Sequence, residues 1–369
     1  MNIKKTKLIF FHPYSSVGGV DLSLSTLMNN LNPKKYSIDF ICIKRAKNTI
    51  SLNKNIKIYE LKTTRTLFSL FQFRKIIKKN LEFNYKKIIL LSNQNFANII
   101  SFLFTFNLRN KLKLIAFERN HIDELNYFFN LKDKLKKNIL KFLIKFTYNK
   151  FDKVITNSKE SSKDLQKLTG TKISTMYNPL KLKNIKVKKK KKNFSLNILN
   201  VGRLEKQKDQ ITLIKAVMIV SQKINIKLKI IGSGSQYFFL KRSIKNYGIE
   251  KNVQIIKETK NVKKFYLESD LFVLTSIYEG FPNVLAESIM HNLPVISSNC
   301  KSGPKEILIC DNNKNMFKVK NYIELSKKIL FFHFNKKKFN KKNPIIKKNL
   351  NNFYYKKILK KFDNIIESI

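Results

Sequence analysis

Short apolar runs alternate with helical patterns along both halves of the chain, and this alternation restricts the fold more than any other feature. In the first half, helical patterns over residues 20–31, 67–80 and 161–168 fill gaps between strand-like runs. Alternating strands and helices predict a parallel sheet covered by helices on both faces. The predicted strands of this half are residues 8–11, 37–43, 56–61, 87–91, 113–117, 153–156 and 172–177.

The second half repeats the pattern, with a final helix over residues 350–369. Between the halves, residues 179–194 are rich in lysine and include five lysines in a row at 188–192, which predicts a solvated linker. We therefore expect an α/β fold of two Rossmann-like, doubly wound domains, residues 1–178 and 195–349, facing an interdomain cleft that binds ligands. The predicted strands are residues 195–201, 226–231, 253–256, 271–275 and 294–297, and the helices are residues 209–222, 235–247, 262–268, 282–292 and 322–332.

The chain of 369 residues is strongly basic, with 75 Lys and Arg against 24 Asp and Glu. Its net charge of +51 attracts polyanions, either nucleic acid or an anionic membrane surface. Mutational bias is an equal alternative, because abundant Lys, Asn, Ile, Phe and Tyr without Trp are typical of an AT-rich genome. The lysine run lacks interleaved aromatic residues, so no specific nucleic-acid partner is expected.

Cysteine usage and hydropathy indicate the compartment. The three cysteines, Cys42, Cys300 and Cys310, form no C-x-x-C motif, which argues against a disulfide framework or a structural zinc site. The longest uncharged window, residues 88–108, is interrupted by Ser, Asn and Gln, so no transmembrane helix is predicted. The first apolar run leads into a turn and predicts a buried strand rather than a signal peptide. We expect a cytoplasmic protein, and its charge would allow attachment to the inner face of the cytoplasmic membrane.

The stretch from Ser276 to Glu287 contains two carboxylates at a strand end. It follows the predicted strand 271–275 and enters the predicted helix 282–292. Glu279 therefore lies in the loop at the carboxyl end of a strand, where open α/β sheets bind ligands, and Glu287 lies about two turns into the helix. Carboxylates in these places can accept hydrogen bonds from hydroxyls of a sugar or a ribose.

These residues resemble a retaining glycosyltransferase of family 4, in the GT-B class called glycosyl transferases group 1. That family pairs two glutamates eight positions apart, as here (287 − 279 = 8), and continues with a Pro-Val turn and a Gly-x-x-Glu motif, found here at 294–295 and 303–306. The resemblance covers most of the chain and is strongest over residues 197–308. The chain departs from the family at 310–316, where the usual Gly-x-Asn-Gly turn has no glycine.

The resemblance implies a hexosyl or related transferase that takes a sugar from a nucleotide-sugar donor. The acceptor would be a glycan or a lipid-linked molecule in the biosynthesis of surface polysaccharide, lipopolysaccharide or glycolipid. It also implies that the terminal helix over residues 350–369 packs back on the first domain.

A second motif follows the predicted strand 195–201. Gly202 permits close backbone approach, Arg203 can bind phosphate oxygens with its guanidinium, and Lys208 adds a cation just before a helix amino terminus. Taken alone, these would be surface cations of a basic protein. They match the family pattern G-R-x-x-x-x-K, and the resemblance implies that Arg203 and Lys208 bind the donor diphosphate while Gly202 lies beside the nucleotide.

Two glycine-containing loops are further candidates for donor binding. Gly18 and Gly19 lie between the first strand and the first helix, where exposed N–H groups can hold an anion, although a plain turn is the alternative. They resemble the family's Gly-Gly loop, which approaches the donor phosphates or the acceptor. Gly232 and Gly234 resemble the Gly-x-Gly loop beside the donor nucleotide.

The resemblance also implies how the two glutamates divide the donor between them. Glu279 would contact the sugar hydroxyls, together with Gly280, Phe281 and Pro282 of the same loop. Glu287 would contact the ribose of the nucleotide.

Histidine and arginine residues near strand ends complete the set of candidates. His121 follows the predicted strand 113–117 and faces the predicted cleft, and relatives with a histidine there use it at the donor sugar. We expect it to be catalytic together with Glu279. Arg119 is a candidate phosphate or acceptor contact, and His12 is a candidate for lining the cleft.

No D-x-D motif occurs in the chain, so no metal and no cofactor other than the donor are expected. Arg203 and Lys208 would neutralise the diphosphate instead. The family's retaining reaction is thought to proceed by attack on the same face, with the leaving phosphate taking the acceptor's proton. A covalent glycosyl-enzyme through Glu279 is the less favoured alternative.

Two basic segments with apolar residues, 67–79 and 135–146, could lie on an anionic membrane leaflet. Each could equally be an ordinary helix that covers the sheet. Two rival functions remain open. One is a charge-driven nucleic-acid-binding protein, and the other is an inactive GT-B scaffold that serves as a partner subunit.

Overall fold

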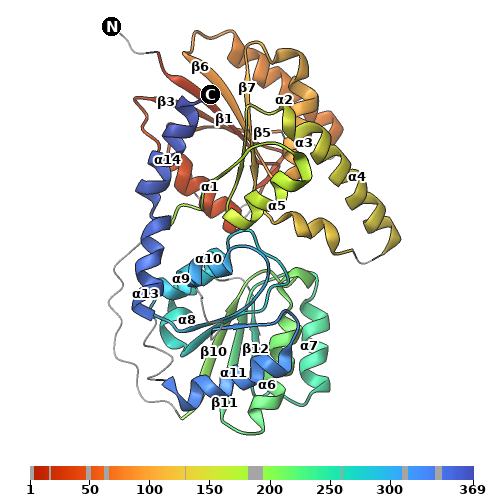
Figure 1. Ribbon diagram of the computed structural model, residues 1–369, viewed down its shortest axis with the longest axis vertical. Coiled ribbons are helices and arrows are strands. Elements are labelled where there is room, and N and C mark those ends of the chain that lie inside the picture. The colour runs from red at the N-terminus through yellow and green to blue at the C-terminus, as the bar shows by residue number, and fades with distance from the viewer. Residues whose placement is uncertain are drawn as a thin grey trace. The chain divides into compact units, whose positions relative to one another are not determined.

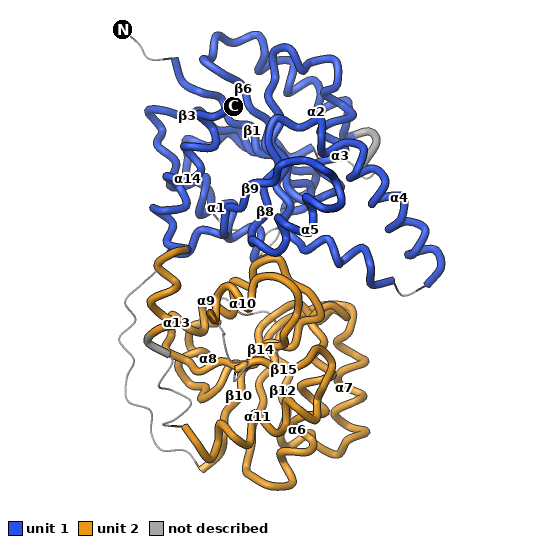
Figure 2. Tube along the Cα trace, viewed as in Figure 1, with its two compact units in different colours: residues 1–181, 353–369 blue, residues 182–352 orange. Residues whose placement is uncertain are grey.

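The chain folds as two compact units in the computed structural model. Unit 1 comprises Met1–Lys181 and Phe353–Ile369, and unit 2 comprises Leu182–Asn352 (Figure 2). The structure describes residues 4–15, 18–46, 51–61, 66–128, 130–181, 194–257, 259, 261–309, 315–336 and 343–369.

Unit 1 is built around a parallel sheet of seven strands in the order β5-β3-β1-β6-β7-β8-β9 (Figure 1). The chain winds outward in one direction from β1 and then in the other, as in a Rossmann-like fold. The strands are β1 (Thr6–Phe11), β3 (Tyr36–Cys42), β5 (Lys57–Glu60), β6 (Lys87–Asn93), β7 (Lys113–Glu118), β8 (Lys153–Thr156) and β9 (Ile173–Thr175). A short parallel pair, β2 (Tyr14–Ser15) and β4 (Lys44–Arg45), lies apart from this sheet.

Two apolar cores lie on the two faces of this sheet. Alternate residues of β1 supply them: Ile9 and Phe11 join one core, and Leu8 and Phe10 join the other. Buried residues of α2, α3, α4 and α5 complete the first core, and those of α1 and α14 complete the second. The helices of unit 1 are α1 (Gly19–Asn30), α2 (Thr66–Leu81), α3 (Asn95–Thr105), α4 (Leu131–Thr147), α5 (Lys159–Thr169) and α14 (Tyr355–Glu367).

The carboxyl-terminal helix α14 belongs to unit 1 by its packing. Phe362 stacks on Phe10 with ring centroids 6.5 Å apart, and the hydroxyl of Tyr36 donates to Asp363 at 2.6 Å. Four apolar residues of α14 are buried at positions typical of one helical face: Ile358, Phe362, Ile365 and Ile366. The helix therefore closes the core that it shares with α1.

Unit 2 contains a second parallel sheet, in the order β12-β11-β10-β13-β14-β15. Numbered within the sheet this is 3-2-1-4-5-6, the order of a dinucleotide-binding fold. The strands are β10 (Leu196–Val201), β11 (Ile226–Ile231), β12 (Val253–Ile256), β13 (Leu271–Leu274), β14 (Val295–Ser298) and β15 (Met316–Phe317). The helices are α6 (Gln210–Ser221), α7 (Tyr237–Asn246), α8 (Val262–Glu268), α9 (Asn283–Met290), α10 (Pro304–Leu308), α11 (Tyr322–Phe334) and α13 (Asn343–Asn349).

The predicted fold class, an α/β chain with two Rossmann-like parallel sheets, is confirmed. One observed helix boundary differs from the predicted one because the backbone leaves helical geometry. The predicted helix 282–292 is shorter, since Pro282 caps α9 with an extended ψ of 91° and Asn292 adopts a left-handed φ of 57°. Strands β2, β4 and β15 have two residues each and were not predicted, because so short a run shows no period. The predicted linker lies outside the described residues over 182–193, as do residues 310–314.

Candidate active site

The strand order of unit 2 reverses between β10 and β13, and ligands of such sheets bind at the carboxyl ends of strands where this happens. The loop after β10 carries Gly202, Arg203 and Lys208. The loop after β13 carries Ser276 and Glu279. The two predicted motifs therefore meet at one edge of the sheet.

Three hydrogen bonds that involve the main chain join these two loops. The Gln207 side chain donates to the carbonyl of Tyr278 at 2.9 Å, and the Gln207 carbonyl accepts from the N–H of Ile277 at 2.8 Å. The hydroxyl of Thr275 donates to the carbonyl of Lys208 at 2.8 Å. Because the bonds involve the main chain, they hold one loop against the other whatever the side chains of Lys208 and Glu279 do.

Lys208 and Glu279 form an ion pair, with 2.5 Å between Nζ and Oε1. The same carboxylate oxygen accepts from the hydroxyl of Ser276 at 2.6 Å. The side chains of Lys208 and Glu279 are only 16% and 8% exposed. A cation held in so poorly solvated a place interacts more strongly with a bound anion than one in bulk water.

The glycine loop after β11 packs directly on the loop after β10. A Cβ atom on Gly232 would lie 1.9 Å from the carbonyl oxygen of Gly202, and one on Gly234 would lie 2.5 Å from that of Leu204. Both glycines have a positive φ, 156° and 152°. No other residue fits these positions without displacing the backbone.

The remaining predicted donor residues of unit 2 differ in exposure. Arg203 is exposed and donates to Gln207 at 3.4 Å, so its guanidinium lies in solvent. Gly280, Phe281 and Pro282 are buried. The carbonyl of Gly280 accepts from the hydroxyl of Ser302 at 2.9 Å. In this loop, Glu279 is the residue whose side chain can offer carboxylate oxygens.

Glu287 lies on α9 and accepts a hydrogen bond from the hydroxyl of Tyr266 at 3.1 Å. The Tyr266 ring stacks on the imidazole of His291, with centroids 4.8 Å apart. Burial raises the pKa of the Glu287 carboxyl above its ordinary value, and the Tyr266 bond opposes this rise. Sequence reasoning missed Tyr266, because it lies 21 residues before Glu287 on another helix.

In unit 1, the predicted anion loop meets a carboxylate of the protein itself. Gly18 is the N-cap of α1, which begins at Gly19, and its N–H donates to Asp21 at 3.3 Å. His12 is buried with Nε2 3.6 Å from Asp21, and desolvation lowers the pKa of its imidazole. The Gly18 N–H, which was expected to face a bound anion, therefore donates to the carboxylate of Asp21 instead.

Arg119 and His121 follow β7 in the interior of unit 1. The guanidinium of Arg119 donates to Asn178 at 3.0 Å and to Asn93 at 3.3 Å. Arg119 is 3% exposed, and burial lowers its pKa to about 10. Arg119 thus ties elements of unit 1 together, and its role as a phosphate or acceptor contact stays a prediction.

His121 is 1% exposed in this structure, and its predicted place facing the cleft stays a prediction. Its Nδ1 accepts from the N–H of Asp123 at 3.1 Å, and Nε2 lies 3.4 Å from Asp164. A neutral imidazole whose Nδ1 accepts a hydrogen bond carries its proton on Nε2.

Known proteins resemble this chain in sequence and in fold. Residues 181–349 match the family model described as glycosyl transferases group 1. A solved structure of Anabaena HepE with UDP and glucose superposes with a TM-score of 0.80 over 98% of this chain and all of that one, at 15% identity. The chain has the GT-B fold.

Three curated relatives of this GT-B chain carry glycosyltransferase names. An uncharacterized glycosyltransferase of Methanocaldococcus jannaschii is 33% identical over 56% of this chain and 53% of its own length. An N-acetylgalactosaminyltransferase of Campylobacter jejuni, named for a diphospho-undecaprenol substrate, is 32% identical over 51% and 54%. The chain thus spans about half the length of these two. The amylovoran biosynthesis glycosyltransferase AmsD of Erwinia amylovora is 28% identical over 82% and 83%.

Unit 1 of the GT-B chain also contains a buried polar network that sequence reasoning missed. Glu118 accepts from the hydroxyl of Tyr148 at 2.8 Å and from the N–H of Arg119 at 3.1 Å. The Tyr148 oxygen in turn accepts from Asn98 at 2.9 Å. Burial raises the pKa of the Glu118 carboxyl to about 7. No signal in the sequence separates this residue from an ordinary acid that follows a strand.

We expect Glu118 to make the stability of the protein depend on pH. The folded state holds its proton more tightly than the unfolded chain, so its contribution to the free energy of unfolding is full below pH 4.5 and is lost as the pH rises toward 7. The loss should be on the order of 3 kcal/mol. Glu118→Gln should flatten a plot of Tm against pH in this window, whereas the exposed control Glu250→Gln should not. Equal slopes for the two variants would contradict this assignment.

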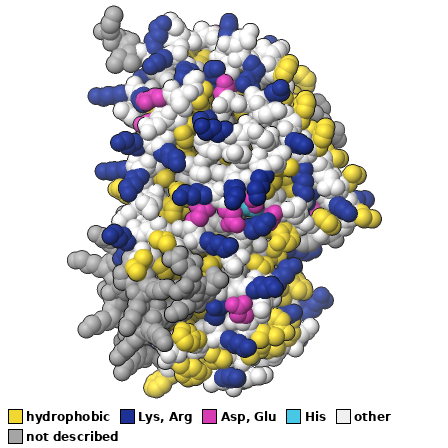
Figure 3. All heavy atoms as spheres, viewed as in Figure 1, with side chains coloured by type: hydrophobic (Ala, Val, Ile, Leu, Met, Phe, Trp, Pro, Cys, Tyr) yellow, Lys and Arg dark blue, Asp and Glu magenta, His cyan; other side chains and the backbone are white. Residues whose placement is uncertain are grey.

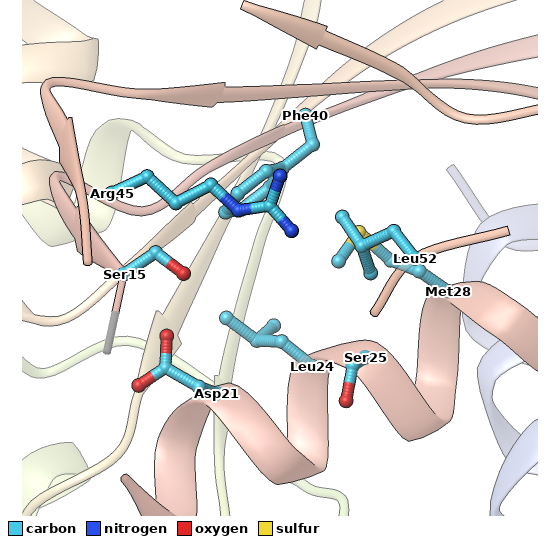
Figure 4. A pocket seen from close by; sticks show the side chains of 8 residues that line it. All are labelled: Ser15, Asp21, Leu24, Ser25, Met28, Phe40, Arg45 and Leu52. Atoms are coloured by element: carbon cyan, nitrogen blue, oxygen red, sulfur yellow. The ribbon is translucent and has the colours of Figure 1, made fainter. Parts of the chain in front are cut away.

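A small pocket opens in unit 1 beside α1 (Figure 4). The guanidinium of Arg45 and the carboxylate of Asp21 approach it from different elements, with apolar side chains between them (Figure 4). Its lining residues are Ser15, Asp21, Leu24, Ser25, Met28, Phe40, Arg45 and Leu52. The pocket thus combines one cation, one anion and an apolar wall.

Basic side chains are spread over the visible face of the GT-B chain rather than gathered in one patch (Figure 3). In the parts of the chain that the structure describes, no three His, Cys, Asp or Glu side chains are grouped as metal ligands would be. Within the same parts, no helix is both long and apolar enough to span a membrane.

Proposed function

We propose that this GT-B protein transfers a sugar from a nucleotide-sugar donor to a glycan or lipid-linked acceptor, with retention of anomeric configuration, in the assembly of surface polysaccharide or glycolipid. The observation that carries the proposal is the contact of Lys208 with Glu279 at the point where the strand order of unit 2 reverses. The diphospho-undecaprenol substrate in the name of the Campylobacter relative and the amylovoran biosynthesis in that of the Erwinia relative support the class of acceptor.

The donor is held by the two basic side chains and two carboxylates of unit 2. Lys208 and Arg203 neutralise the diphosphate, Glu279 accepts from sugar hydroxyls, and Glu287 accepts from the ribose after exchanging its bond with Tyr266. An ammonium group has three N–H donors, so Lys208 can keep its contact with Glu279 while it binds a phosphate oxygen. The pair of Lys208 and Glu279 thereby joins the binding of the diphosphate to the binding of the sugar.

In the proposed reaction the acceptor oxygen attacks the anomeric carbon from the face that the phosphate leaves. The bond between that carbon and the phosphate oxygen breaks, and the leaving phosphate oxygen takes the acceptor's proton. The protein contributes by positioning the substrates and by stabilising the negative charge that develops on the diphosphate. Lys208 and Arg203 supply that stabilisation in this proposal, with no divalent metal.

Glu279 is better suited to orient the sugar than to attack it. Its Oε1 is already bound by the ammonium of Lys208 and the hydroxyl of Ser276, both of which lower its nucleophilicity. His121 of unit 1 is proposed to donate its Nε2 proton to a sugar hydroxyl after it exchanges its contact with Asp164, since its Nδ1 accepts from the main chain.

Calorimetric titration with UDP-, GDP- and ADP-sugars tests the proposal. We expect one donor to bind selectively, equally well with and without EDTA, and to lose most of its affinity in Lys208→Ala and Glu279→Ala. Lys206→Ala is the matched control, because it removes the same charge from the same loop at a position where the motif specifies no residue. Binding of no donor would favour the inactive scaffold, and salt-sensitive RNA binding in its place would favour a polyanion-binding protein.

A further inference from the structure

Helix α4 of unit 1 exposes a continuous apolar stripe. Five of its apolar side chains are between 52% and 83% exposed: Leu131, Leu135, Ile139, Phe142 and Phe146. They follow one another at spacings of three or four positions, so they lie on one face along the whole helix. Exposed apolar side chains on a monomer are usually scattered singly, and a continuous stripe marks an interaction surface.

The stripe is additional to the face by which α4 packs on its own unit. Ile144 is buried in the core, and Leu140 and Leu143 pack against the same core. α4 also contacts α3 and α5. The helix therefore packs on unit 1 through a separate apolar face, and the exposed stripe is not needed for that packing. Figure 1 shows α4 extending outward from the sheet of unit 1.

Helix α2 is a comparison within the same unit. The sequence suggested that both basic helices could lie on a membrane. Among the described side chains of α2, Leu70, Phe73 and Ile77 are buried and cover the sheet, whereas Phe71 is exposed. The structure thus separates a sheet-covering helix from one with an outward apolar face.

Lysines flank the stripe on both sides. At 100° per residue, Lys132 and Lys136 fall on one side of it, and Lys134, Lys141 and Lys145 fall on the other. The single acidic residue of α4, Asp133, is paired with Lys137 at 3.1 Å. A partner for this face must offer an apolar layer bordered by negative charge.

An anionic bilayer meets both requirements, because its headgroups attract lysine and its acyl region accepts Leu, Ile and Phe. A second copy of the chain would bring one set of lysines against another. Nucleic acid would satisfy the lysines and leave the apolar stripe in contact with charged phosphates. We propose that α4 docks unit 1 on an anionic phospholipid surface, lying in its plane with the stripe inserted. The docking does not depend on the proposed transfer reaction, since bare lipid provides neither donor nor acceptor.

The absence of tryptophan from the chain allows a direct test. Phe142→Trp introduces a single reporter into the stripe, and Phe238→Trp introduces one at an 81% exposed position of α7 in unit 2. Vesicles of phosphatidylglycerol and phosphatidylcholine in equal amounts should shift the emission of the Phe142→Trp protein to shorter wavelength. Phosphatidylcholine vesicles should not, and high salt should weaken the shift. The Phe238→Trp protein should respond to neither.

Vesicle sedimentation of two multiple variants separates the apolar and charged contributions. Replacing Leu135, Ile139 and Phe142 by Gln, a good helix former, should weaken binding by about 10²-fold. Replacing Lys132, Lys136 and Lys145 by Gln should weaken it about fivefold per lysine. Circular dichroism checks that both variants keep their helices. Unchanged binding in either variant would overturn the proposal, as would a Phe142→Trp shift that appears without vesicles as protein concentration rises.

Discussion

Lys208→Ala is expected to lower the rate of donor turnover by about 10²–10³-fold, the usual cost of removing one group that stabilises developing negative charge. The ammonium is held 2.5 Å from Glu279 at a poorly solvated position. Water that entered the variant there would stabilise negative charge on the diphosphate less well than the ammonium does. The variant should also disturb the sugar contact, because Glu279 loses its cation. The measurement is kcat for release of the nucleoside diphosphate from the donor chosen by the binding titration.

Lys206→Ala and a double variant serve as controls for that result. Lys206 lies two positions away and is exposed, so its removal should leave kcat within a factor of about two. Lys208→Ala combined with Glu279→Gln should cost less than the two single losses together, because the side chains act as a pair. An equal loss of turnover in Lys206→Ala would show that general charge is what matters, against the specific role of Lys208.

Gly232→Ala is expected to reduce the free energy of unfolding by at least about 3 kcal/mol, or to prevent folding of unit 2. The added Cβ would lie 1.9 Å from the carbonyl oxygen of Gly202, a backbone atom that cannot rotate away. The backbone φ of 156° adds strain for any residue with a Cβ. Urea denaturation followed by circular dichroism measures the effect.

Gly248→Ala is the matched control, since this glycine also has a positive φ, 63°, but has no atom within 4 Å of the added Cβ. It should cost only about 1–2 kcal/mol, the strain of a left-handed backbone. Similar losses for the two variants would mean that the contact between the loops after β10 and β11 has little energetic weight. If Gly232→Ala folds, we expect it to bind donor weakly, because the loop with Arg203 and Lys208 must shift.

Much of the fold is present in local sequence patterns. The predicted strands 153–156, 226–231 and 253–256 and the predicted helix 262–268 agree with β8, β11, β12 and α8 to the residue. Apolar runs bounded by polar turns need only short-range information to be recognised. The same holds for the meeting of the two donor motifs, since a rule about strand ends brings Lys208 and Glu279 together across 71 residues of chain.

The environment of each polar side chain was decided by the tertiary structure. Glu118 ends β7 and Arg119 follows it, as candidate ligands at a strand end do, and packing places both in the interior with partners from other elements. Tyr266 reaches Glu287 from a different helix. Both α2 and α4 combine lysines with apolar residues, but of these two helices the structure shows a long exposed apolar stripe on α4. Secondary structure follows from the period of neighbouring residues. Burial, and with it hydrogen bonding, pKa and accessibility, depends on residues that are distant in the chain.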